Sequence, residues 1–236
     1  YTAVDGAEHE VDQARQTNTL GPDLLAKACA DRGIPLIHLS TDYVFDGRAE
    51  QPYQVSAAPK PISAYGRSKL AGEEAVKANV TNHIILRLSG IFSAGGNCFP
   101  RSILTAALRQ RELKVVDDQI TGPTSARSIA AVIDELASKT CNQDISWGTY
   151  HFAQQPFVSW HEFALIILER AKQLDGRFAE TEVFPVSTAD FGGIAPRPKY
   201  SCLDSSKIID ECDLDPMILC WSGELDGTIH AIINDL

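Results

Sequence analysis

The feature that most limits how this chain can fold is a repeated alternation between a helix-forming stretch and a short apolar run. Residues 22–32 place leucine and alanine at helical spacing, and the apolar run 34–39 follows after one glycine. Residues 64–78 repeat the helical pattern before the apolar run 83–88. This alternation is typical of parallel sheets covered by helices. We therefore expect 34–39 and 83–88 to be adjacent or near-adjacent inner strands whose carboxyl ends share one cleft.

The alternation continues to the end of the chain. Helices are predicted over 99–111, 128–139, 161–173, 205–211 and 223–234, and strands over 113–117, 149–153 and 182–186. The fold class indicated is α/β, with a Rossmann-like, mostly parallel sheet and a smaller C-terminal lobe that binds substrate. We assign 1–92 and 126–153 to the sheet domain, and 93–125 and 154–236 mainly to the substrate lobe.

The first residues indicate that the sheet is incomplete. The chain begins at Tyr1 without a methionine, and residues 1–5 read as the exit of a strand. We expect further strands upstream, and we expect an exposed apolar sheet edge where those strands would pair.

Composition excludes several classes of partner. The net charge of −10 argues against nucleic acid and anionic membranes, because both are polyanions. The apolar runs are far shorter than the roughly 20 residues that cross a bilayer, so we expect a soluble, cytoplasmic protein. The six cysteines are scattered without metal-ligand spacing, which predicts reduced thiols and no metal site.

The central chemical signal is the pair Tyr65 and Lys69. Four residues apart on a predicted helix, the phenol and the ammonium lie on one face. A cationic Lys69, helped by the positive charge of an oxidised nicotinamide, favours the phenolate, so we expect the pKa of Tyr65 to be lowered and the phenol to be a usable acid–base group.

Polar side chains crowd the end of the first predicted strand. Ser40, Thr41 and Asp42 follow its apolar run, about two dozen residues before Tyr65. Thr41 is placed to donate a hydrogen bond to a substrate carbonyl and align it beside Tyr65. The same three residues also suit an ordinary turn and helix cap.

Order and spacing together carry a resemblance to a known family. The quoted motifs are Ser-Thr-Asp-Tyr-Val-Phe-Asp-Gly at 40–47, Pro52-Tyr53, Tyr-Gly-Arg-Ser-Lys-Leu-Ala-Gly-Glu at 65–73, Val-Asp-Asp-Gln at 116–119, Gly-Pro-Thr at 122–124, Ser-Trp-His-Glu-Phe-Ala at 159–164 and Ala-Pro-Arg-Pro at 195–198. Across essentially the whole chain this pattern resembles the dTDP-4-dehydrorhamnose reductases, which are extended short-chain dehydrogenases/reductases. The resemblance implies reduction of the 4-keto group of a dTDP-linked deoxysugar by NADPH or NADH.

The resemblance also implies roles for single residues. Thr41, Tyr65 and Lys69 would be catalytic, with Tyr65 as proton donor and Lys69 on the nicotinamide ribose. The implied cofactor contacts are Tyr1, Thr2, Leu39, Ser40, Tyr65 and Lys69, and the implied substrate contacts are Thr41, Asp42, Tyr43, Gly90 and Arg197. Arg197 has a chemical reason of its own, because a guanidinium fork suits diphosphate oxygens, although a surface arginine is an equal reading.

Two departures from the family pattern matter. The glycine-rich turn that holds the cofactor pyrophosphate is expected about sixty residues upstream, so this chain alone should bind dinucleotide poorly. Gly90 stands where the family commonly has a tryptophan against the sugar, which leaves the sugar open.

Alternative functions share the same residues. A nucleotide-sugar epimerase or dehydratase uses the same Tyr and Lys pair, but dehydratases resembling this class carry glutamate where this chain has Tyr43. A non-catalytic regulatory subunit of methionine adenosyltransferase also resembles these reductases, although the intact Thr41, Tyr65 and Lys69 favour catalysis. The sequence leaves open NADPH against NADH and oligomeric state, including a homodimer.

Overall fold

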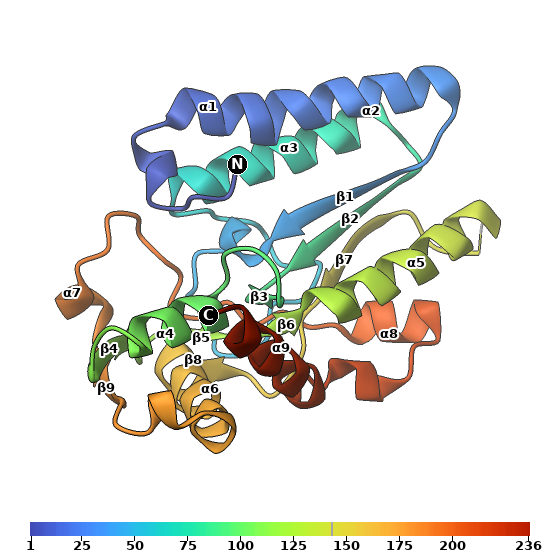
Figure 1. Cartoon of the computed structure of the whole chain (residues 1–236). Coiled ribbons are helices and arrows are strands. Elements are labelled where there is room, and N and C mark those ends of the chain that lie inside the picture. The colour runs from blue at the N-terminus through green and yellow to red at the C-terminus, as the bar shows by residue number, and fades with distance from the viewer. Residues whose placement is uncertain (143) are drawn as a thin grey trace.

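A three-stranded parallel sheet is built from strands that lie between residues 36 and 152 (Figure 1). The computed structural model describes residues 1–142 and 144–236. Strand β1 (Leu36–Thr41) pairs with β2 (His83–Leu88), which pairs with β7 (Gly148–Phe152). The predicted α/β class and the adjacency of the first two strands are confirmed, but β1 is the end strand among those described and not an inner one.

The first strand also begins later than the apolar run predicts. Gly33 ends the preceding helix in a left-handed conformation, and Ile34 still donates to the Cys29 carbonyl. Pro35 has no N–H to donate, so the ladder starts at Leu36. Ile34 and Leu39 are 50% and 41% exposed, which agrees with the apolar edge that was expected.

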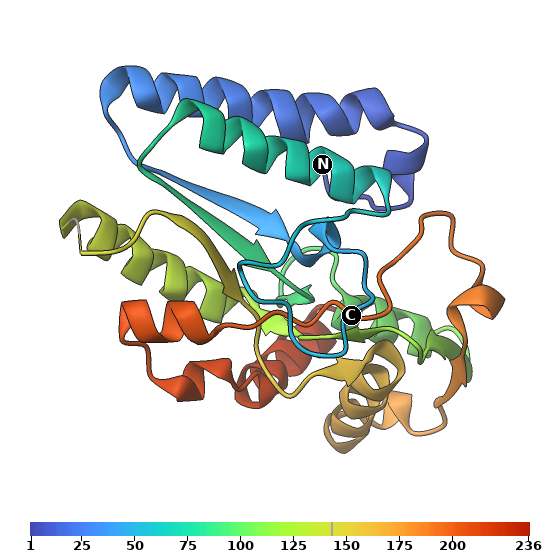
Figure 2. The same cartoon turned by 180° about the vertical axis from the view of Figure 1, so that it is seen from behind.

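Two long helices cover one face of this sheet (Figure 2). The first runs from Val11 to Arg32 as α1 (Val11–Arg15), a π-helical turn η2 (Gln16–Leu20) and α2 (Gly21–Arg32). The second is α3 (Ala64–Asn79), whose N-cap Ser63 accepts a hydrogen bond from the Gly66 amide. Residues 1–5 form no strand, and this prediction was wrong. The Tyr1 ammonium donates instead to Asn18 Oδ1.

The opposite face is covered by α5 (Ala126–Asn142) and α8 (Ser206–Cys212). Their apolar side chains share one cluster with β2 and β7. Its buried members are Ile84, Leu86, Leu88, Ile129, Val132, Leu136, Tyr150, Phe152, Ile208 and Cys212. Because α8 lies on this face, the segment that joins it to the last helix returns toward the second lobe.

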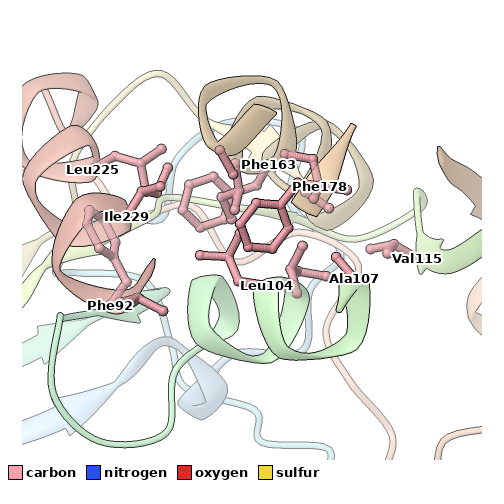
Figure 3. Packing of buried hydrophobic residues seen from close by; sticks show 14 of the residues in the cluster. Phe92, Leu104, Ala107, Val115, Phe163, Phe178, Leu225 and Ile229 are labelled. Carbon is pink, nitrogen blue, oxygen red and sulfur yellow. The ribbon is translucent and has the colours of Figure 1, made fainter. Parts of the chain in front are cut away.

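The second lobe has its own core (Figure 3). Helices α4 (Phe99–Ala107), α6 (Trp160–Leu174) and α9 (Ser222–Asp235) pack around it, with β4 (Glu112–Val116) parallel to β9 (Glu182–Val186). Leu104, Phe163 and Leu225 meet there, and each side chain is at most 1% exposed. Helix α4 ends before the predicted residue 111, because Arg109 and Gln110 turn the chain into β4.

Short elements join the two parts. Strand β3 (Ile91–Phe92) pairs with β6 (Thr124–Ser125), and β5 (Ile120–Thr121) pairs antiparallel with β8 (Val158–Ser159). The remaining helical pieces are η1 (Gly6–Glu8), η3 (Asp42–Val44), η4 (Gly176–Phe178), α7 (Thr188–Phe191) and η5 (Pro216–Leu219). The described helices include none long and apolar enough to cross a membrane. The boundary between sheet domain and substrate lobe stays a prediction.

Candidate active site

The predicted acid, Tyr65, lies in the first turn of α3 beside the carboxyl end of β1. The helix can approach η3 so closely because residue 66 is glycine: a Cβ there would lie 2.2 Å from the Tyr43 carbonyl oxygen. The Tyr43 and Tyr65 rings meet edge to face with centroids 5.7 Å apart. Thr41 is close enough for its hydroxyl to influence the pKa of Tyr65. The two residues therefore lie on the same side of the molecule, and the cleft that they are expected to share stays a prediction.

The pKa of Tyr65 is raised in this structure, and its lowering by Lys69 together with an oxidised nicotinamide stays a prediction. Burial raises the pKa of Tyr65 to about 12; the Thr41 hydroxyl opposes this shift and the Asp42 charge adds to it. The Lys69 ammonium instead donates to the Leu39 carbonyl at 2.7 Å. A phenol with a raised pKa stays protonated near neutrality, which suits a proton donor better than a base.

Lys69 has donors left for a further partner. Burial lowers its pKa, while the nearby Glu73 carboxylate opposes that shift. An ammonium carries three N–H groups, and the Leu39 carbonyl takes one. The face of α3 that carries Tyr65 and Lys69 therefore presents both a phenol and free ammonium donors.

Asp42 does not face a ligand directly. Its side chain is only 4% exposed; Oδ1 accepts from Thr41 Oγ1 at 2.9 Å and Oδ2 accepts from Ser89 Oγ at 2.9 Å. Burial raises its pKa to about 6, although hydroxyls of Ser201, Thr41 and Ser89 oppose the shift. Both carboxylate oxygens of Asp42 are thus already hydrogen-bonded within the protein, and its implied contact with the sugar stays a prediction.

A cavity of about 320 Å³ opens beside Tyr43 and extends between the two lobes. Its walls combine aromatic and apolar side chains with a few polar ones. They are Tyr43, Phe99, Ile103, Lys114, Val115, Val116, Gln119, Trp160, Thr188, Phe191, Gly193, Ala195 and Arg197. The place of Trp160 in this wall depends on how α4 packs against α6, which the sequence alone does not show.

Arg197 lies at this cavity and is already paired. Its Nη2 donates to Asp5 Oδ2 at 2.6 Å, and its charge opposes the burial that raises the pKa of Tyr43. Asp5 Oδ1 also accepts from the Ala195 amide at 2.9 Å. The N-terminal segment therefore holds the loop that carries Arg197 next to Tyr43.

Gly90 does not line the cavity. Its φ is 53°, and a Cβ would lie 2.7 Å from the Gly122 carbonyl oxygen, so this backbone has no room for a side chain at residue 90. The implied contact between Gly90 and the sugar stays a prediction. Aromatic walls come instead from Phe99, Trp160 and Phe191.

The residues implied at the cofactor end are brought together only in part. Tyr1 packs in a small cluster with Tyr65, Ala64 and neighbouring alanines. Thr2 is exposed and makes no contact that places it near Lys69. The Leu39 carbonyl holds Lys69, and Ser40 Oγ donates to Glu73 Oε1 at 2.6 Å.

A buried ion pair supports the site and was missed from sequence. Arg87 Nε and Nη2 donate to the two Glu73 oxygens at 2.9 and 2.6 Å, and both side chains are at most 2% exposed. Glu73 lies one turn beyond Lys69 on α3. The available signal was Arg87 itself, a charged residue inside the apolar run 83–88.

The described residues contain no cluster of side chains that could bind a metal ion. Within residues 1–142 and 144–236, no group of three or more His, Cys, Asp or Glu side chains is placed to hold a metal ion. His38 is half-buried on β1, where burial lowers its pKa to about 4, and its Nε2 is buried without a hydrogen-bond partner.

Comparison with known proteins agrees with this geometry. The family model described as the RmlD substrate binding domain matches residues 1–230. The dTDP-4-dehydrorhamnose reductase of Aggregatibacter actinomycetemcomitans is 38% identical over 217 residues, which cover 92% of this chain and 74% of that protein. A solved dTDP-4-dehydrorhamnose reductase from Clostridium acetobutylicum has a TM-score of 0.88 at 32% identity, covering 100% of this chain and 79% of that one.

The enzyme of the same name from Bacillus anthracis, solved in complex with NADP, has a TM-score of 0.86 at 32% identity and covers 100% of this chain and 78% of that one. The family model covers nearly all of the chain, and the relative from Aggregatibacter is matched over most of its length. The chain therefore belongs to the RmlD substrate binding domain family, the family of the dTDP-4-dehydrorhamnose reductases.

Proposed function

We propose that the protein reduces the 4-keto group of dTDP-4-dehydrorhamnose to give dTDP-L-rhamnose, with NADPH or NADH as reductant. The observation that carries this proposal is the placement of Thr41, Tyr65 and Lys69 together where β1 ends against α3, next to Tyr43, which lines the cavity. Family membership supplies the reaction class, since the named relatives are dTDP-4-dehydrorhamnose reductases.

The residues at the end of β1 fit a nicotinamide cofactor. The His38 Nε2 atom is buried without a partner on the strand that carries the Leu39 carbonyl, and Lys69 has ammonium donors free for ribose hydroxyls. When bound, the reduced nicotinamide supplies the hydride. Tyr65 and Lys69 would lie beside the bound nicotinamide.

Tyr65 would complete the reduction as the acid. Its raised pKa keeps the hydroxyl protonated, and the alkoxide formed by hydride addition is more basic than a phenolate. Arg197 and Lys114 are the cations lining the cavity, and we assign the substrate diphosphate to them. The aromatic walls would exclude water from the reacting carbonyl.

Net consumption of reductant tests the proposal. The full-length protein is mixed with dTDP-4-dehydro-L-rhamnose and either NADPH or NADH, and both absorbance of the reduced nicotinamide and the sugar product are followed. We expect one cofactor oxidised per dTDP-rhamnose formed. Conversion of a sugar without net oxidation would indicate an epimerase or dehydratase, and inactivity together with copurification of an adenosyltransferase would indicate the regulatory subunit.

Location and assembly follow as further proposals. The six cysteines are free thiols, which suits the reducing cytoplasm. We expect a homodimer, which sedimentation of the full-length protein would check.

A further inference from the structure

Residues 189–197 form a strap along the cavity, and several of them line it. The strap is anchored at both ends. Before it, the Thr188 amide donates to Asp118 Oδ1 at 2.8 Å. After it, Pro198 packs so closely on Gly47 that a Cβ on that glycine would lie 2.5 Å from the Pro198 Cα. Most of the strap between these anchors is exposed, so its place over the cavity depends on what holds its last residues.

Asp5 holds the end of the strap that carries Arg197. Its Oδ1 accepts from the Ala195 amide at 2.9 Å, and its Oδ2 accepts from Arg197 Nη2 at 2.6 Å. Ala195 is 5% exposed, whereas Ile194 just before it is 62% exposed. The hydrogen bond from Arg197 holds the pKa of Asp5 below its ordinary value, so Asp5 is ionised at neutral pH. One carboxylate thus fixes both the backbone of the strap and its cation.

The strap itself encloses the Arg197 guanidinium on a second side. A Cβ on Gly193 would lie 2.7 Å from Arg197 Nη1, so the backbone at this glycine packs directly on the guanidinium. The pairing with Asp5 uses Nη2 and leaves further N–H groups of Arg197 for phosphate oxygens. Arg197 lines the cavity in this fixed orientation.

An arginine side chain is long and flexible, and ordering it when a ligand binds costs free energy. A guanidinium that is already held in its binding geometry avoids that cost. We propose that Asp5 is a positioning residue that holds Arg197 and the strap in place to bind the diphosphate of the substrate. This inference rests on the proposed function, which supplies a dTDP-linked substrate. Asp5 acts through Arg197 and does not itself line the cavity.

The charge of Asp5 alone would have the opposite effect on binding. A carboxylate beside the diphosphate repels it, so removal of Asp5 would tighten binding if overall charge decided the affinity. Positioning of Arg197 predicts weaker binding when Asp5 is removed. The direction of the change therefore separates the two effects.

Binding of dTDP to the full-length protein, measured by isothermal titration calorimetry, tests the proposal without turnover. Asp5→Ala should weaken dTDP binding about tenfold, and Arg197→Ala at least as much. In the Arg197→Ala background, Asp5→Ala should have little further effect, because Asp5 acts through Arg197. Asp12→Ala, which removes an exposed carboxylate from α1, is the control and should leave the affinity unchanged. Unchanged or tighter binding in Asp5→Ala, or no dTDP binding by the wild type, would overturn the inference.

Asp5→Asn separates the pair with Arg197 from the hold on the strap backbone. Asparagine keeps an acceptor for the Ala195 amide but loses the charge and the second carboxylate oxygen. Hydrogen exchange of the Ala195 amide, followed by NMR, should therefore stay slow in Asp5→Asn and become faster in Asp5→Ala. Affinity for dTDP should fall in both variants. Wild-type affinity in Asp5→Asn would contradict the role of the carboxylate–guanidinium pair.

Steady-state kinetics separate this inference from the proposed function. With dTDP-4-dehydro-L-rhamnose as substrate, Asp5→Ala should raise KM about tenfold and leave kcat within about twofold of the wild type. A fall in kcat with unchanged KM would contradict a positioning role in binding. Failure of the reductase proposal would look different, because it would show as an inactive wild type that still binds dTDP more tightly than Asp5→Ala does.

Discussion

Arg87→Met should be among the most destabilising single substitutions near the site. It removes two charge-assisted hydrogen bonds, of 2.9 and 2.6 Å, from a glutamate that is 0% exposed. Methionine keeps much of the volume that packs against Phe45. The variant loses the hydrogen-bonded cationic partner of a buried charge and keeps only Lys77, whose Nζ lies 3.8 Å from Glu73 Oε2. The expected loss of unfolding free energy is about 3–5 kcal/mol. That is a large share of the roughly 5–15 kcal/mol that stabilises a domain.

The pH dependence of this loss identifies its cause. Burial alone would raise the pKa of Glu73, but Arg87, together with Ser40, holds it below its ordinary value of 4.5. In the wild type this pair therefore contributes stability above the unfolded pKa, and the contribution is lost as pH falls through the folded pKa. Without Arg87, burial raises the pKa of Glu73. The variant therefore loses unfolding free energy at pH values above the ordinary pKa of glutamate, where the side chain is ionised in the unfolded protein. The deficit should be larger at pH 7 than at about pH 4.

Urea denaturation of both proteins at the two pH values measures the deficit. Arg111→Met is the matched control, because its 2.7 Å pair with Glu180 joins side chains that are 80% and 69% exposed. The control should lose at most about 1 kcal/mol. The reasoning fails if Arg87→Met loses no more than the control at pH 7, or if its deficit does not depend on pH.

Three further outcomes follow from the same geometry. Lys69→Met should weaken NADPH binding about tenfold, through lost charge-assisted hydrogen bonds, as measured by fluorescence titration; unchanged affinity would remove Lys69 from the cofactor site. Gly66→Ala should destabilise by about 1–3 kcal/mol and lower turnover, because its Cβ meets the Tyr43 carbonyl 2.2 Å away and must push Tyr65 aside; wild-type melting and turnover would contradict this packing. Leu104→Ala should lose about 2–5 kcal/mol in urea denaturation with little change in KM, and a KM effect larger than the stability effect would contradict its purely structural place in the second lobe.

The sequence predicted those helices and strands that are determined by residues close together in the chain. Ser63 as a cap and the apolar run 83–88 gave α3 and β2 with nearly the observed bounds. The first half of the long helix was missed, since residues 11–20 carry threonine, asparagine and a π-turn whose Asn18 is fixed by Ser68, fifty residues away. Two-residue strands such as β3 and β6 exist only because the chain brings distant segments together.

In the candidate site, too, features set by local spacing were predicted, and features set by distant residues were not. The spacing of Tyr65 and Lys69 predicted their common face, because helical periodicity alone sets it. The burial that raises the pKa of Tyr65 had no signal in the sequence, because the surrounding fold supplies it while Lys69 is held by the Leu39 carbonyl. The Asp5–Arg197 pair joins residues 192 positions apart and had no signal in the sequence.

The central claim is that Tyr65 gives the proton that completes reduction, and Tyr65→Phe tests it most directly. The full-length variant is assayed for NADPH oxidation with dTDP-4-dehydro-L-rhamnose, and NADPH binding and unfolding are measured in parallel. Tyr150→Phe is the control, because it removes another part-buried, hydrogen-bonded phenol from β7 on the far side of the sheet. Turnover of Tyr65→Phe should fall by at least about 10²-fold while NADPH affinity and folding change little, and Tyr150→Phe should keep its turnover. Undiminished turnover in Tyr65→Phe would contradict the account.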